Sequence, residues 1–141
     1  MYAVIGDDYT PPCGQSVPNA NIDVVLVGDS HAAHLFPGLV ELLPKKNIGY
    51  YTLGAIPPFD DGAEMKRIID YIAQDPFIRT VIVNAYWSSY DVSERELLET
   101  LQKFRQNGKQ VFVTDDIPFF LFPAYECKYP INPKWAKHRC T

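Results

Sequence analysis

The chain has 141 residues, of which 47% are hydrophobic and 13% aromatic, and its formal net charge is -4 at neutral pH. This length suits one domain, and the composition is far from that of a disordered chain. The acidic balance, without any basic stripe, argues against a nucleic-acid partner. No apolar run reaches the roughly 18 residues that a membrane span needs, and the first residues lack the form of a signal peptide.

Strand and helix patterns alternate along the chain. Residues 1–21 are dense in Pro and Gly, which predicts an irregular lead-in. Short apolar runs rich in β-branched residues predict buried strands over residues 23–28, 48–53, 79–84 and 110–114. Apolar side chains at helical spacing predict helices after residue 31, over residues 63–74 and from residue 93. No element is predicted in the Pro-rich and aromatic stretch that follows residue 116.

Specific residues mark two of the helices. Pro37 would cost about 3 kcal/mol inside a regular helix, so we expect a short first turn and then a helix that begins at Pro37. Ser93 and Glu96 have the spacing of a capping box, and Gly108 lies where a C-terminal cap is expected.

Four alternations of strand and helix predict βαβ units, whose strands form a parallel sheet between layers of helices. The predicted fold is therefore α/β, a three-layer α/β/α sandwich with a mostly parallel sheet. We expect one domain over residues 1–141, which consists of the lead-in 1–21, an α/β core over 22–116 and a tail over 117–141.

Candidate site residues follow the predicted strands at their carboxyl ends, where open parallel sheets bind ligands. Ser30 lies where a strand becomes a helix, so its hydroxyl can attack a carbonyl while nearby N–H groups receive the oxyanion. Gly54 lets its N–H approach a ligand closely, and the amide of Asn84 can donate to an oxyanion. Together the three predict an oxyanion pocket. Local structure explains them as well, with Ser30 as a helix N-cap and the other two as turn residues.

The acidic residues at these strand ends have a simpler interpretation. Asp29 adjoins Ser30 in sequence and therefore points away from it, so we expect Asp29 to anchor the turn through backbone N–H groups. Asp115 and Asp116 are interpreted as loop residues. No Cys/His spacing typical of a metal site is present, so no metal ion is expected.

The string GDSHAAHLFPGL, residues 28–39, resembles the first block of the SGNH/GDSL hydrolase superfamily, and in particular the SGNH domain of acyltransferase-3 membrane proteins. AIPPF, VIVNAYW and VFVTDDIPFF after the later strands support the resemblance, which covers residues 23–127. It implies a flavodoxin-like SGNH fold in which Ser30 is the nucleophile and an oxyanion donor. Gly54 and Asn84 fall near the second and third blocks.

The same resemblance implies a function. Such proteins O-acylate lipopolysaccharide and other surface glycans, so Ser30 would take an acyl group, usually acetyl, from a membrane domain and pass it to a sugar hydroxyl. Tyr86, Trp87 and His34 are the expected substrate-binding residues. Tyr86, Trp87 and Tyr90 indicate an aromatic surface near the pocket that suits a sugar ring, although core packing explains these three residues nearly as well. No cofactor is expected. The implied location is the periplasmic or extracellular face, with the full-length protein tethered to the inner membrane.

Three alternatives stay open. Water as the second nucleophile would make the protein an SGNH-type esterase or deacetylase. A domain that keeps the serine turn but lacks a base would bind glycans without catalysis. A flavodoxin-like nucleotide binder fits the order of elements, but the first strand is not followed by a glycine-rich phosphate loop.

The resemblance fails near the C-terminus, where SGNH enzymes have an Asp-x-x-His motif. The last histidine here is His138, and position 135 is Trp135. His31 and His34 follow Ser30 too closely to serve well as its base. We therefore expect that the chain is cut before the base and a fifth strand, and that it is catalytically incomplete as it stands.

The cysteines are Cys13, Cys127 and Cys140. Because their number is odd, at least one has no disulfide partner within the chain, and the alternative is that all three are reduced thiols. The compartment that the resemblance implies is oxidising. There Cys127 and Cys140, which flank one loop, can form a disulfide, and the partner of Cys13 would lie upstream.

Overall fold

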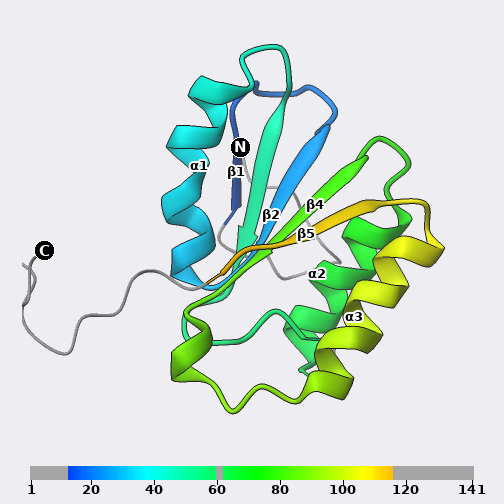
Figure 1. Ribbon diagram of the computed structural model, residues 1–141. Coiled ribbons are helices and arrows are strands. Elements are labelled where there is room, and N and C mark those ends of the chain that lie inside the picture. The colour runs from blue at the N-terminus through cyan, green and yellow to red at the C-terminus, as the bar shows by residue number, and fades with distance from the viewer. Residues whose placement is uncertain (1–12, 60–61, 116–141) are drawn as a thin grey trace, which may run out of the picture.

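The computed structural model describes residues 13–59 and 62–115 (Figure 1). Its elements in chain order are β1 (Cys13–Gln15), β2 (Val24–Gly28), α1 (Ser30–Leu42), β3 (Ile48–Thr52), α2 (Ala63–Gln74), β4 (Thr80–Asn84), the 3-10 helix η1 (Trp87–Ser89), α3 (Glu94–Gln106) and β5 (Gln110–Val113). Cys13 is a free thiol on β1. Asp116 and the predicted tail with Cys127, Cys140 and His138 lie outside the described residues.

The strands form one sheet in the order β1-β3-β2-β4-β5. β2 pairs in parallel with β3 and β4, and β4 pairs in parallel with β5. β2 is buried along its whole length, which explains its unbroken apolar run. The predicted α/β class and mostly parallel sheet are confirmed.

β1 is a difference from the prediction, because it lies in the stretch expected to be irregular. It has only three residues and pairs antiparallel with β3 at the edge of the sheet. Such a short segment carries no periodic pattern, and its extended form depends on the neighbouring strand.

The helices cover both faces of the sheet, as predicted (Figure 1). α1 packs over β2 and β3, while α2 and α3 lie together on the opposite face. The main core lies between the sheet and these last two helices, and its largest fully buried members are Val25, Val27, Tyr51, Met65, Ile68, Ile69, Ile72, Ile78 and Phe104. The sandwich therefore has three layers.

One prediction about a helix boundary is wrong, and one about a helix cap is confirmed only in its position. α1 runs without a break through Pro37, where we expected a helix to begin. Pro37 is exposed, and packing of α1 on the sheet outweighs the cost of the lost backbone hydrogen bond. Ser93 is the N-cap residue of α3, but its side chain makes no capping hydrogen bond.

The end of α3 follows the prediction. Gly108 has a left-handed φ of 75°, and its N–H donates to the Arg105 carbonyl at 3.0 Å. The N–H of Lys109 donates to the Phe104 carbonyl at 3.1 Å. This pair of hydrogen bonds is a Schellman motif, in which glycine adopts the left-handed conformation at little cost.

Asn47 fastens the loop between β1 and β2, and its removal should destabilise the fold. Asn47 is 5% exposed. Its Oδ1 accepts hydrogen bonds from Ser16 Oγ at 3.1 Å and from the N–H of Val17 at 2.9 Å. Its Nδ2 donates to the carbonyls of Ala20 and Asn21, each at 3.1 Å. Asn47→Ala removes all four of these hydrogen bonds. We expect the free energy of unfolding in urea to fall by about 2–4 kcal/mol. Asn21→Ala, which removes an exposed side chain, is the control and should change it by less than about 0.5 kcal/mol.

Candidate active site

The turn from β2 into α1 requires glycine at position 28. A Cβ atom on Gly28 would lie 1.7 Å from the backbone oxygen of Asn84 on the paired strand β4. This close approach sets the turn directly beside the end of β4. Asp29 is the N-cap of the helix and Ser30 is its first residue, so the interpretation of Ser30 as an N-cap is wrong.

Asp29 holds the turn with both carboxylate oxygens. It is 3% exposed. Its Oδ1 accepts the N–H of His31 at 2.8 Å, and its Oδ2 accepts the N–H of Tyr86 at 2.9 Å and the hydroxyl of Tyr90 at 2.8 Å. The expectation that Asp29 anchors the turn through backbone N–H groups is confirmed.

The hydrogen bond from Tyr90 persists over a wide pH range. Burial, donation to Asp29 and the negative charge of that carboxylate raise the pKa of Tyr90. The protonated phenol is therefore the form that the fold favours. Its contribution is fully present below the ordinary tyrosine pKa of about 10, and is lost as the pH rises through the raised value.

A cavity of about 430 Å³ opens at this turn, within the size range of small-molecule sites. Its lining residues are Asp29, Ser30, His31, Ala55, Tyr86, Ser89 and Tyr90. The side chain of Ser30 is exposed there. Ser30 therefore lines the cavity at the N-terminus of a helix, where the helix dipole favours developing negative charge.

The His31 ring forms one wall of the cavity. Its centroid lies 4.8 Å from that of Tyr86 and 5.7 Å from that of His34. Its Nδ1 is buried and has no hydrogen-bond partner among the described residues. His34, predicted to bind substrate, is exposed one turn further along α1 and is not part of the lining.

The other predicted oxyanion donors lie around the cavity rather than in its lining. Gly54 is exposed and precedes Ala55, which lines the cavity with a left-handed φ of 56°. Asn84 is 4% exposed, and its amide nitrogen donates to the hydroxyl of Thr114. Its Oδ1 is buried and has no partner within the part of the chain that the structure describes.

The three predicted aromatic residues separate in the structure. Tyr86 and Tyr90 line the cavity. Trp87 is not among the lining residues: its ring stacks on Phe59 with centroids 6.3 Å apart, and its Nε1 donates to the Thr114 carbonyl at 2.9 Å.

Sequence reasoning missed Ala55 and Ser89 as lining residues. Each lies in a loop at the carboxyl end of a strand, close to a residue that was predicted. Extending each prediction from one residue to its whole loop would have found both, because loops at this edge of a parallel sheet share one site.

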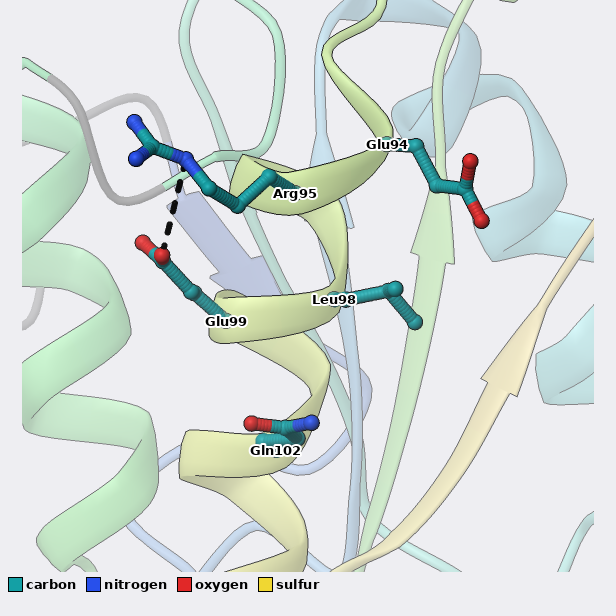
Figure 2. A pocket seen from close by; sticks show the side chains of 5 residues that line it. All are labelled: Glu94, Arg95, Leu98, Glu99 and Gln102. Carbon is teal, nitrogen blue, oxygen red and sulfur yellow. Dashed lines mark ion pairs between the residues drawn. The ribbon is translucent and has the colours of Figure 1, made fainter.

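A second depression lies on the outer face of α3 (Figure 2). Its lining residues are Glu94, Arg95, Leu98, Glu99 and Gln102. Arg95 and Glu99, one turn apart, form an exposed ion pair with 3.7 Å between Nε and Oε1, a type of contact worth at most about 1 kcal/mol. None of the five is a hydroxyl, thiol or imidazole, so the Ser30 cavity is the better candidate for an active site.

Residues 13–59 and 62–115 contain no group of three or more His, Cys, Asp or Glu side chains that could hold a metal ion. No helix in them has the length and apolar character needed to cross a membrane.

Comparison with known proteins places this geometry in a family. No curated protein and no solved structure matches the chain. A family model described as "SGNH domain (fused to AT3 domains)" matches residues 3–141, which include the Ser30 turn and every residue that lines the cavity. The chain therefore belongs to the SGNH domains that occur fused to acyltransferase-3 domains.

Proposed function

We propose that this domain transfers an acyl group, acetyl in the simplest case, to a sugar hydroxyl of a cell-surface polysaccharide or lipopolysaccharide. The family supports an acyl-transfer or hydrolase chemistry. The observation that carries the proposal is the exposed Ser30 hydroxyl, which lies at a helix N-terminus in the wall of a cavity.

The reaction has two half-steps. Ser30 Oγ attacks the carbonyl carbon of the donor and gives its proton to a general base, and the carbonyl oxygen becomes an oxyanion. When the tetrahedral intermediate collapses, the bond to the leaving group breaks and the base returns the proton to that group. The sugar hydroxyl then attacks the acyl-serine, transfers its own proton by the same route and releases Ser30.

The oxyanion is stabilised at the start of α1. Asp29 takes the N–H of His31 through its side chain and the N–H of Ala32 through its carbonyl, and neither bond uses the N–H of Ser30. We propose the N–H of Ser30 as the first oxyanion donor, with Gly54 and Asn84 as the other two.

The acceptor sugar is proposed to bind along the segment that follows β4. Tyr86 and Tyr90 bring apolar ring faces to the cavity and Ser89 brings a hydroxyl, a combination that suits a sugar ring. Trp87 and His34, just outside the lining, are proposed as further contacts for a longer glycan.

The proposed setting is suggested by the AT3 domains to which SGNH domains of this family are fused. A membrane-embedded AT3 portion of the full-length protein would deliver the acyl group. The domain would then work on the periplasmic or extracellular face and be tethered to the inner membrane. We propose no nucleic-acid partner and no cofactor for this chemistry.

A second candidate is a glycan-binding domain that does not catalyse transfer. One observation favours it: residues 114–141 contain no Asp-x-x-His motif, and His138 is preceded by Trp135 at the third position. A serine without its base would keep the cavity and lose the chemistry.

A trapping experiment separates these functions. The full-length protein is incubated with p-nitrophenyl acetate, digested and analysed by mass spectrometry. The proposal expects one acetyl group on the peptide that contains Ser30, and none in Ser30→Ala. Added glycan should then carry the acetyl group if the domain is a transferase, whereas acetate in solution indicates an esterase. Glycan binding without any acetylated peptide would instead support the second candidate.

A further inference from the structure

One carboxylate oxygen joins two segments that are far apart in the sequence. Asp29 Oδ2 accepts both the N–H of Tyr86 and the hydroxyl of Tyr90, which comes 61 residues later in the chain. Asp29 belongs to the nucleophile turn, and both donors belong to the segment 84–90 that runs from the end of β4 through η1. Three residues of that segment, Tyr86, Ser89 and Tyr90, line the Ser30 cavity. The position of the segment therefore sets the shape of the cavity.

The segment 84–90 is fastened at both ends. At its start, Asn84 and Trp87 donate to the hydroxyl and the carbonyl of Thr114 after β5. At its end, the backbone N–H of Tyr90 donates to the Trp87 carbonyl at 3.1 Å, which closes η1. The Tyr90 hydroxyl then crosses to Asp29 at 2.8 Å. This last bond ties the C-terminal end of the segment to the nucleophile turn.

We propose that Tyr90 is a positioning residue for acyl transfer. Its hydroxyl, through Asp29, holds the segment 84–90 against the Ser30 turn and so fixes the side of the cavity where the acceptor sugar is proposed to bind. This inference rests on the proposed function. Asp29 is also the N-cap of α1, so the same side chain caps the first helical turn and holds the segment 84–90. Loss of the Tyr90 hydroxyl removes one donor from a buried carboxylate and releases the end of the segment. The raised pKa of Tyr90 agrees with this role, because the donor keeps its proton at working pH.

Tyr90→Phe is the test, because it removes the hydroxyl and keeps the ring in the cavity. The chain has two tryptophans, so a Trp135→Phe background leaves Trp87 of η1 as the only fluorophore of that type. Two measurements need no substrate: acrylamide quenching of Trp87 and hydrogen exchange at the Tyr86 amide. The kcat and the KM for glycan acceptor are measured on the full-length protein.

We expect Tyr90→Phe to raise the quenching constant of Trp87 about twofold and to speed exchange at the Tyr86 amide about tenfold or more. The kcat/KM for the acceptor should fall about tenfold, because a loosened segment 84–90 misplaces the sugar hydroxyl that attacks the acyl-serine. Tyr50→Phe is the matched control. Tyr50 lies on β3, outside the cavity lining, and packs edge-on against Phe36. This variant should leave all three readouts unchanged.

Two results would overturn the proposal. The first is a fall in activity with wild-type quenching and exchange, which would make Tyr90 a direct substrate contact. The second is a loosened segment with unchanged kcat and KM. If Tyr90→Phe does not fold, Asp29→Asn must produce the same two loop changes. If Tyr90→Phe does fold, the double variant Tyr90→Phe/Asp29→Asn must show no more loosening of the segment 84–90 than either single variant. Failure of the proposed function would appear separately, as the absence of acetyl on Ser30 with the loop effects intact.

Discussion

Ser30→Ala is expected to lower the rate of acyl transfer by at least about 10³-fold, while the free energy of unfolding stays within about 0.5 kcal/mol of the wild-type value. The two effects separate because Ser30 is exposed and the helix cap is supplied by Asp29. Removal of the hydroxyl deletes the atom that forms the acyl bond, and no neighbouring side chain loses a capping contact.

The rate is measured on the full-length protein as acetyl incorporated into glycan, and stability is measured by urea denaturation. Ser93→Ala is the control, since the Ser93 side chain makes no capping bond at α3. It should keep the wild-type rate. A Ser30→Ala protein that folds normally and transfers acetyl at more than about one-tenth of the wild-type rate would exclude Ser30 as the nucleophile.

Gly28→Ala is expected to lower the free energy of unfolding by about 3 kcal/mol or more, which is a large share of the total stability of a single domain. The new methyl group would lie 1.7 Å from the Asn84 backbone oxygen and 3.2 Å from Ala32 Cβ. The first of these atoms belongs to β4, which pairs with β2 on one side and β5 on the other, so it cannot move without breaking the sheet.

Gly38→Ala is the matched control for this substitution. Gly38 is in α1, and a Cβ atom there would have no heavy atom within 4 Å. Alanine at this helical position should raise the free energy of unfolding by about 0.5–1 kcal/mol. The free energy of unfolding of both variants is to be measured by urea denaturation followed by circular dichroism. A Gly28→Ala protein as stable as the wild type would mean that β2 and β4 are not so close.

The sequence predicted those parts of the fold whose pattern is local. The strand from Val24 to Gly28 is apolar throughout because both of its faces are buried, and Gly108 marks a helix end because few other residues adopt its φ. β1 could not be predicted, since three residues at a sheet edge take their form from β3. Pro37 misled the prediction because tertiary packing overrides a local penalty.

The site was predictable to the same degree. The place of Ser30 at the cavity could be predicted because it follows a buried strand and begins a helix. The anchoring role of Asp29 could be predicted because a carboxylate beside a turn accepts backbone N–H groups. The contact between Asp29 and Tyr90 could not, because it depends on how the loop after β4 folds back on the turn after β2. Gly54 was favoured for its missing side chain, whereas the lining residue is Ala55, placed by the shape of that turn.

The central place of β2 has a consequence for heat inactivation. Leu26 and Val27 have neighbouring strands on both sides and no exposed surface, so their amide protons exchange only when the whole sheet separates. Ser30 follows that strand after a single residue, and it is therefore anchored to the part of the domain that melts last. Gradual warming should loosen the segment 84–90, with Tyr86 and Tyr90, before the rest of the domain. Ser30 should keep its position until the entire domain unfolds.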